Sequence, residues 1–152
     1  MMPAKNHLSG QDFDVMFGDT MIHVENMSAS ITDNRQAVQT RGIPNGWVNG
    51  DVACSGDLEL DSANFKLLID VARTAGSFRE IKTIDIVCVG KTLDSEQKQE
   101  FFGCLLKISD LFSIDGKGGE KNKHKIAFEV TSPDFVRIDG VSYLSANNIR
   151  DL

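Results

Sequence analysis

The chain has 152 residues, of which 41% are hydrophobic and 25% charged, with a formal net charge of −6 and a pI near 5.0. This length suits one domain with a single buried core. The acidic balance argues against a protein that grips nucleic acid, because binding to phosphates requires a basic surface.

Three cysteines, Cys54, Cys88 and Cys104, are widely spaced and form no C-x-x-C pair. An odd number of cysteines without metal-binding spacing indicates free, mostly buried thiols in a reducing compartment. The N-terminal residues hold no apolar stretch typical of a signal peptide, and no apolar run approaches the ~18 residues of a membrane helix. We expect a soluble protein made in the cytosol, without a membrane partner.

The beginning of the chain is predicted to be β. Residues 1–9 are polar and are expected to form a flexible arm, followed by one domain over 10–152. The alternation at Phe13, Val15 and Phe17 favours a strand. A turn at Gly18–Asp19 and two strands, over about 20–26 and 28–33, follow.

The segment 34–51 has no clean period and is predicted to be a long loop. It holds several glycines, one proline and the only tryptophan of the chain, Trp47. Its length is unusual, since most loops in compact domains run ~4–6 residues. Because tryptophan usually seeks burial, its position in the most turn-rich segment raises the question of which surface covers it.

One amphipathic helix is predicted over about 62–75. An apolar stripe with the helical spacing i, i+3, i+4, i+7 begins at Phe65. Asp61 or Ser62 can cap its start, and Gly76 stands where a helix-ending glycine belongs.

Strands are predicted on both sides of this helix. In the strand at 52–60, Gly56 is expected to mark a bulge or a bend. Residues 92–100 are polar and predict a loop or a single helical turn, while Asp139–Gly140 is a strong hairpin signal. The strands after the helix are expected over 81–89, 101–112, 124–130 and 136–144.

Strands before and after a lone helix, without repeating βαβ units, predict a mainly β protein. We expect a two-sheet β-sandwich or a small barrel, with the helix at 62–75 on its flank and the long loop at 34–51.

No motif supports a reaction. VCVGKT at 87–92 resembles the end of a phosphate-binding loop, but Asp85 stands where the first glycine is required, and the stretch reads as a strand. His7, His23 and His124 are scattered without metal-ligand spacing, and no serine or cysteine has a nucleophile signature. We therefore predict no catalytic residue, no metal and no cofactor.

Charged residues gather in two places. Asp57 and Glu59 belong to an acidic stretch over 51–61 that contains no lysine or arginine. This stretch is either a solvated face or a surface that faces something anionic without holding it. The only basic cluster, either a solvated turn or a docking element for an acidic neighbour, consists of Lys117, Lys121, Lys123 and Lys125.

The order of elements resembles the tail tube proteins of contractile-tailed bacteriophages. The similar portions are GIPNGWVNGDVACSGDLELD at 42–61, the helix after it and the terminal VRIDGVSYLS. The resemblance implies two sheets packed as a sandwich or small barrel with a flanking helix. It also implies that six subunits form a ring whose sheets join around a channel, and that rings stack into the inner tube of a virion tail.

The resemblance further implies a location and partners. The protein would be assembled in the host bacterial cytoplasm, would contact tail sheath and tape-measure proteins, and would let DNA pass without specific binding. The same fold serves the tubes of type VI secretion systems and R-type pyocins. A type VI-like tube subunit and a β-sandwich adaptor or tail completion protein therefore stay open as alternatives, whereas an enzyme has no support.

Two sets of site residues follow. In the family a long loop reaches the adjacent ring, which would bury Trp47 on a neighbour, although it could also fold back on its own domain. Asp57 and Glu59 share one strand face and are candidates for an acidic channel wall. The candidate intersubunit residues are Gly42, Ile43, Pro44, Gly46, Trp47, Val48 and Gly50.

Overall fold

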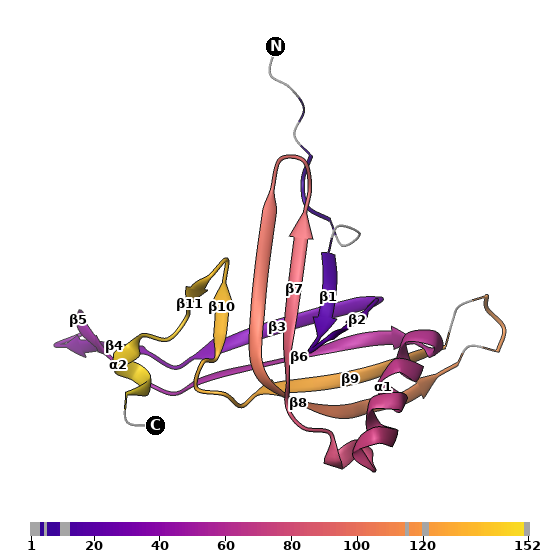
Figure 1. Cartoon of the computed structure of the whole chain (residues 1–152). Coiled ribbons are helices and arrows are strands. Elements are labelled where there is room, and N and C mark those ends of the chain that lie inside the picture. Colours follow the sequence, from indigo (N-terminus) through magenta and orange to yellow (C-terminus); the bar gives the residue numbers. More distant parts are fainter. Residues whose placement is uncertain (1–3, 5, 10–12, 115, 120–121, 151–152) are drawn as a thin grey trace.

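The protein is mainly β, as its sequence predicts. The computed structural model describes residues 4, 6–9, 13–114, 116–119 and 122–150. Within these ranges the strands form two sheets, one main helix lies beside them, and no barrel closes (Figure 1). The strands are β1 (Phe13–Phe17), β2 (Thr20–Ile22), β3 (Asn26–Asp33), β4 (Gln36–Thr40), β5 (Ile43–Val48), β6 (Val52–Asp61), β7 (Ile84–Lys91), β8 (Glu96–Ser113), β9 (Lys123–Val130), β10 (Val136–Ile138) and β11 (Val141–Ser142). The helices are α1 (Ser62–Ala75), the 3-10 turn η2 (Phe78–Glu80) and α2 (Ala146–Ile149).

The larger sheet has nine strands and folds over itself. Its strand order is β2-β1-β7-β8-β9-β6-β3, with β10 and β11 added beside β8. The first part of β8 pairs with β7 up to Cys104, and the rest, from Cys104 onward, pairs with β9. In Figure 1, β7 and the first part of β8 stand upright, whereas β3, β6 and β9 run across. One long strand therefore belongs to both layers.

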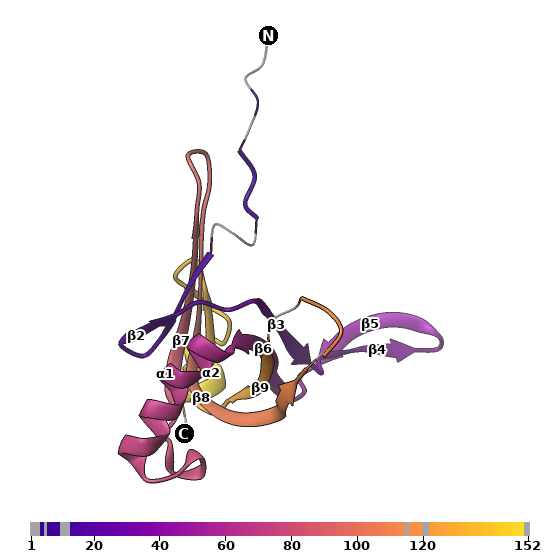
Figure 2. The same cartoon turned by 90° about the vertical axis from the view of Figure 1, so that its right-hand side faces the viewer.

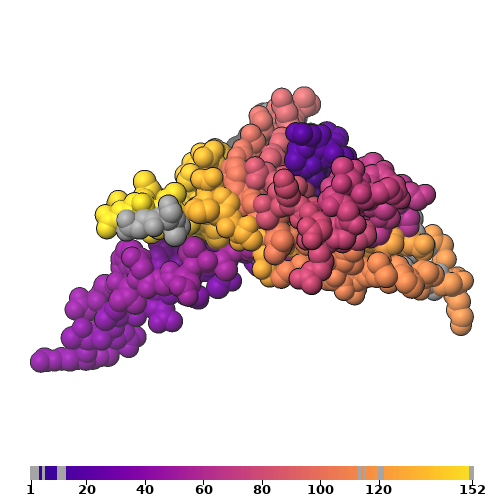
Figure 3. All heavy atoms as spheres, turned by 60° about the horizontal axis from the view of Figure 1, so that its bottom comes forward, coloured from indigo at the N-terminus to yellow at the C-terminus, as the bar shows by residue number. Residues whose placement is uncertain are grey.

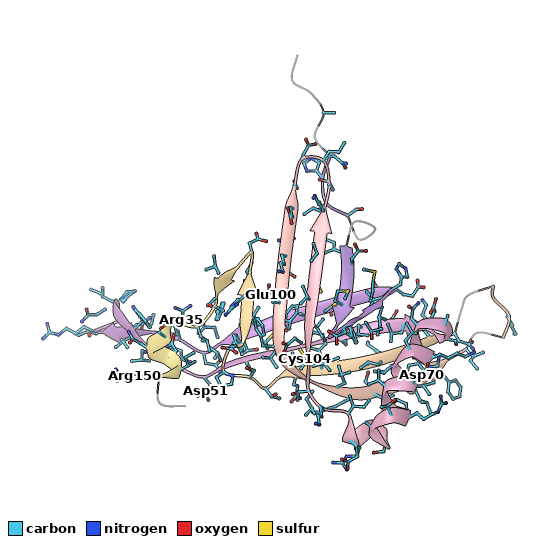
Figure 4. The ribbon with its side chains drawn as sticks, viewed as in Figure 1. Arg35, Asp51, Asp70, Glu100, Cys104 and Arg150 are labelled. Atoms are coloured by element: carbon cyan, nitrogen blue, oxygen red, sulfur yellow. The ribbon has the colours of Figure 1, made fainter. Side chains whose placement is uncertain are left out.

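The bend in β8 lies at Gly103. This residue has a φ of 63°, which a side chain strongly disfavours, and its N–H donates to Asp85 Oδ1 at 3.0 Å. A Cβ at this position would lie 2.8 Å from Ser132 Cβ. Figure 4 labels the neighbouring Cys104 at the point where the two layers meet. Glycine thus permits the close packing that turns one sheet into two layers.

The core fills the space between the layers. Leu58 of β6 is paired with Ile126 of β9, Leu60 and Phe128 lie on the same face of these two strands, and all four side chains are fully buried. Burying one such side chain contributes roughly 1.5–3 kcal/mol. These side chains come from strands that are far apart in sequence, so the core depends on the folded sheet.

Helix α1 confirms its predicted bounds and covers one end of this core. Phe65, Leu68 and Ala72 form its buried stripe. Asp61 Oδ1 accepts the N–H of Asn64 at 2.9 Å, which caps the helix start, and the helix ends at Gly76.

The three cysteines are free and buried, as predicted. Burial raises the pKa of the Cys54 and Cys88 thiols to about 11 and that of Cys104 to about 12. Their thiolates are scarce at neutral pH, so they behave as small apolar core residues.

The segment 34–51 is not a loop, which corrects the prediction. β4 and β5 form an antiparallel two-stranded sheet of their own. Arg41 and Gly42 both have positive φ, at 56° and 78°, which is the backbone of a tight two-residue hairpin turn. Pro44 and the bulge after Ala37 obscure the strand period, and proline is tolerated because the ribbon has only edge strands.

Two smaller predictions concern β6 and the start of β8. Gly56, predicted to mark a bulge or a bend, marks no bulge, since its pairing with Ala29 and Phe128 is in regular register. It is needed for space, because a Cβ there would lie 2.2 Å from the main-chain oxygen of Ser28. Residues 92–100 form neither a loop throughout nor a helical turn, because β8 begins at Glu96 and its polar residues pair with β7.

Other predictions have a mixed outcome. Asp139 and Gly140 form the predicted turn between β10 and β11. The arm predicted over 1–9 lies partly outside the described residues. Within the described ranges, no helix has the length and apolar character needed to cross a membrane.

Candidate assembly surfaces

The hairpin β4–β5 projects from the body of the protein. In Figures 1 and 2 it lies on the side away from α1, and Figure 3 shows it projecting at the lower left from the rest of the molecule. Every residue of both strands is exposed, with Trp47 at 62% and Ile43 at 67%. Trp47 is therefore not covered by its own domain, and Val48 and Val38 add to the same exposed apolar ribbon.

The root of the hairpin is held by polar contacts. Asn34 donates its N–H to Asp51 O at 3.0 Å, and a Cβ on Gly50 would lie 2.2 Å from Asn34 O. The predicted residue Gly50 is therefore required where the two strands come together. The predicted Gly42 and Gly46 both have positive φ within the ribbon.

A cluster of hydrogen-bonded side chains connects this root to the C-terminal part of the protein. Tyr143 Oη donates to Asp33 Oδ2 at 2.7 Å, and Arg35 Nε donates to the same carboxylate at 2.9–3.0 Å. The Arg35 guanidinium lies 5.8 Å from the centre of the Trp47 ring. Figure 4 labels Arg35 beside the helix α2. Sequence reasoning missed this cluster, because Asp33 and Tyr143 are 110 residues apart and belong to no motif.

These contacts change the pKa values of the groups involved. The bond from Tyr143, followed by the bonds from Arg35, lowers the pKa of Asp33 below its ordinary value. The same bond to Asp33 raises the pKa of Tyr143. The carboxylate is thus kept charged, which keeps its two donors in place.

The predicted acidic residues lie on the outer face of a four-stranded layer, formed by β3, β6, β9 and the second part of β8. Asp57 and Glu59 alternate with the buried Leu58 and Leu60, so they point away from the core. Ser28 Oγ donates to Asp57 Oδ1 at 3.1 Å. The two carboxylates therefore share one face, as predicted.

Lysines lie on the same face. Lys125 Nζ is 3.7 Å from Asp57 Oδ2, and Lys107 Nζ is 2.9 Å from Glu129 Oε1. The cross-strand register places both lysines among the outward residues. The face around Asp57 is thus of mixed charge, with a small excess of carboxylates.

The four-stranded layer has two free edges. Among the described strands, β3 pairs only with β6, and β8 beyond Cys104 pairs only with β9. The second edge continues into Leu111, Phe112 and Ile114, each about three-fifths exposed. A free edge with exposed apolar side chains is a template for pairing with another strand.

An apolar groove accompanies each free edge. The β3 groove, of about 460 Å³, lies between β3 and the upright strands and is lined by Met27, Ile31, Phe101 and Val136, among others. The β8 groove, of about 500 Å³, lies between the α1–η2 segment and β8. Its apolar lining consists of Leu68, Phe78, Ile81, Leu105, Leu106, Ile108 and Ile126.

The histidine and the phosphate-loop-like stretch noted in the sequence occupy positions that stabilise the fold. The His124 ring stacks on Phe65 with centroids 4.1 Å apart, and its Nε2 lies 3.2 Å from Ser62 Oγ. VCVGKT belongs to the regular strand β7 and the turn after it. Among the residues that the structure describes, no three histidine, cysteine or acidic side chains are grouped to hold a metal ion.

The sequence is similar to that of one known protein family. Residues 11–144 match the model of the family described as Bacteriophage HP1, Orf24. A relative named "Putative tail tube protein", from Haemophilus phage HP1 (strain HP1c1), is 48% identical over 145 residues, covering 95% of this chain and 97% of the relative. The chain belongs to this family of phage tail tube proteins.

Solved structures share the fold of this tail tube family member. The cap that terminates the tube of the anti-feeding prophage has a TM-score of 0.66 at 15% identity, covering 91% of this chain and 94% of the cap. The sheath/tube terminator of the extracellular contractile injection system PVC has a TM-score of 0.62 at 13% identity, covering 90% and 99%. The resemblance inferred from the sequence is therefore confirmed at the level of family and fold.

Proposed function

We propose that this protein is the repeating subunit of a phage tail tube, in which six copies form a ring and rings stack around a channel that conducts DNA. The observation that carries the proposal is the pair of free edges, β3 and β8, on opposite sides of one four-stranded layer. Two different edges favour a head-to-tail contact, which closes into a ring when the rotation between copies allows it.

Pairing between the edges of two copies would provide hydrogen-bond partners for backbone N–H and C=O groups that the free edges of a single copy leave exposed. Each new main-chain hydrogen bond contributes roughly 0.5–1.5 kcal/mol. Pairing would also cover Leu111, Phe112 and Ile114 at the end of β8. The joined layers would then form a continuous β wall.

The outer face of that layer would line the channel. It would present Asp57, Glu59 and Glu129 together with Lys107 and Lys125. A slight excess of negative charge disfavours a lasting grip on DNA phosphates and allows the duplex to slide. Ser28 and Ser55, on the same face, add small neutral side chains.

The β4–β5 hairpin would reach the adjacent ring. Trp47, Ile43 and Val48 would become buried there, which answers why the only tryptophan lies in an exposed ribbon. The tight turn at Gly42, the proline at 44 and the closed root at Gly50 restrict the ribbon before it binds, which lowers the entropy lost on assembly.

In this role the protein is a structural component of the virion tail and not an enzyme. Its partners would be copies of itself, the sheath outside the tube and the tape-measure protein inside it. Assembly would take place in the cytoplasm of the host bacterium. Support for a sheath contact comes from the similar fold of a sheath/tube terminator.

Negative-stain electron microscopy of the purified protein tests the proposal. Annuli and rods are expected at high protein concentration. A strictly monomeric protein in several salt concentrations, without rings, would contradict it. Replacing 36–48 by a two-residue turn should abolish rods while leaving the circular dichroism spectrum of the core unchanged.

The same images separate the main alternative, a tail completion protein. The anti-feeding prophage cap and the PVC protein are both tube terminators, so this fold serves that role too. A terminator would form single rings without stacking, and a monomeric or dimeric adaptor would form neither. Removal of the hairpin would then leave the oligomeric state unchanged.

A further inference from the structure

The hairpin β4–β5 joins the body of the protein through two short links. Residues 34–35 connect β3 to β4, and residues 49–51 connect β5 to β6. Among the described strands, β4 and β5 pair only with each other, whereas β3 and β6 pair as far as Asp33 and Val52. The bond from Asn34 to Asp51 closes the root, but one main-chain bond does not fix an angle. The two links therefore form a hinge.

Apolar packing does not fix the direction of the hairpin. Every residue of both strands is exposed, and a hollow of about 410 Å³ lies between the hairpin root and the C-terminal segment. From the hairpin side this hollow is lined by Trp47, Asn49 and Gly50, and from the C-terminal side by Tyr143, Leu144 and Asn148. The hollow leaves room for the hairpin to turn about the hinge.

Polar side chains cross the hinge instead. Tyr143 Oη donates to Asp33 Oδ2 at 2.7 Å, and Arg35 Nη2 lies 2.8 Å from the same oxygen. Asp33 ends β3, and Arg35 lies in the link that follows it. The Arg35 guanidinium in turn lies 5.8 Å from the centre of the Trp47 ring in β5. Side chains thus connect the body of the protein to the hairpin across the hinge.

Tyr143 is well anchored for this connection. Its N–H donates to Val136 O at 3.0 Å, and its ring packs against Phe135 with centroids 5.6 Å apart. Val136 and Phe135 are both buried in the core. Hydrogen bonds to a charged carboxylate are stronger than those between neutral groups. The bond to Asp33 therefore ties the hinge to the core.

We infer that Tyr143 is a positioning residue that acts through Asp33 and Arg35 to hold the hairpin β4–β5 at one angle in the free subunit. Through this Tyr143–Asp33–Arg35 lock, the C-terminal segment determines the direction in which Trp47 is presented. The lock is a property of the single copy. Its consequence for rods rests on the proposed function, because a hairpin that already has the direction needed for the adjacent ring loses less entropy on binding.

Nuclear magnetic resonance relaxation of ¹⁵N in the full chain measures the order of the hairpin. In the wild type, the amides of β4 and β5 should have order parameters near the ~0.85 of rigid backbone. Tyr143→Phe removes the hydroxyl and keeps the ring on Phe135, so these values should fall below ~0.6 while those of β6 and β9 stay unchanged. Relaxation dispersion of the same amides detects a slower swing.

A second variant tests the other half of the lock. Asp33→Asn keeps an acceptor for Tyr143 but removes the ion pair with Arg35, and should give intermediate order. Thr40→Val is the matched control. It removes the bond from Asn45 Nδ2 to Thr40 Oγ1 at 3.2 Å, which lies within the hairpin and does not cross the hinge. This control should keep the order of the wild type.

The protein is kept below the concentration at which rings form. At lower concentration still, the time-resolved fluorescence anisotropy of Trp47, the only tryptophan, gives the same comparison. In negative-stain images, Tyr143→Phe should raise the concentration needed for rods by about two- to tenfold, the factor that corresponds to one hydrogen bond. Thr40→Val should assemble like the wild type.

The outcomes separate this inference from the proposed function. A hairpin that is disordered in the wild type, or equally ordered in Tyr143→Phe and Asp33→Asn, would overturn the lock. Equal loosening by Thr40→Val would overturn it too, because a bond that does not cross the hinge would then have the same effect. A loosened hairpin with rods at the wild-type concentration would overturn only the consequence for assembly. A wild-type protein without rods would overturn the tube proposal and leave the lock in place.

Discussion

Helix α1 and the hairpin β4–β5 meet the need for burial in opposite ways. The helix places Phe65, Leu68 and Ala72 on the core of its own chain. The hairpin leaves every residue of both strands exposed, including Trp47. The helix therefore completes the core of the monomer, whereas the hairpin is folded but has no surface within its own chain that covers it.

The core should respond most strongly to mutation. Leu58→Ala removes a fully buried side chain of β6 and should lower the free energy of unfolding by ~2–5 kcal/mol. Urea denaturation followed by circular dichroism measures this loss. Leu93→Ala is the matched control, because Leu93 is 96% exposed and should change stability by no more than ~0.5 kcal/mol. Equal effects of the two substitutions would contradict the burial of β6.

The bend of β8 should show the next largest effect. Gly103→Ala forces a side chain into a φ of 63° and against Ser132, which should cost ~1–3 kcal/mol. Differential scanning calorimetry of this variant can be compared with Gly116→Ala, where no atom lies within 4 Å of the added Cβ. A melting temperature lowered equally in both would show that the bend does not depend on glycine.

A substitution at the hairpin root should lower stability less than the substitutions in the core and at the β8 bend. Tyr143→Phe removes the bond to Asp33 and should raise the pKa of Asp33 toward its ordinary value, as measured by NMR titration. In the wild type the folded pKa is lowered, so the associated stability is present above the ordinary pKa and is lost as pH falls through the folded pKa. The variant should therefore lose less stability in acid. Ser142→Ala, at the exposed residue next to Tyr143, should leave the pKa of Asp33 unchanged.

The hairpin itself should have the smallest effect on the monomer and a large one on assembly. Trp47→Ala removes a side chain that is 62% exposed and should change the free energy of unfolding by no more than ~0.5 kcal/mol. Rods should nevertheless be absent from negative-stain images. Gln39→Ala, an exposed polar change in the same ribbon, should still form rods. Rods of normal length from the Trp47 variant would remove the indole from the ring-to-ring contact.

Local patterns account for what could be predicted. The spacing from Phe65, with Asp61 and Gly76 as caps, describes a helix whose contacts lie within a few residues along the chain. Asp139–Gly140 is a turn for the same reason. The segment 34–51 is predicted to be a loop but forms a hairpin, because Pro44 and a bulge hide its strand period.

Sequence patterns were sufficient to predict the mainly β character, the main helix with its caps, the free buried thiols and the family to which the protein belongs. The ribbon over 34–51, the bond from Tyr143 to Asp33 and the two apolar grooves behind the free edges became visible only in the folded protein. The physical reason is distance along the chain. Periodicity and capping report contacts between near neighbours, whereas edges, grooves and the hairpin root arise where segments up to 110 residues apart meet.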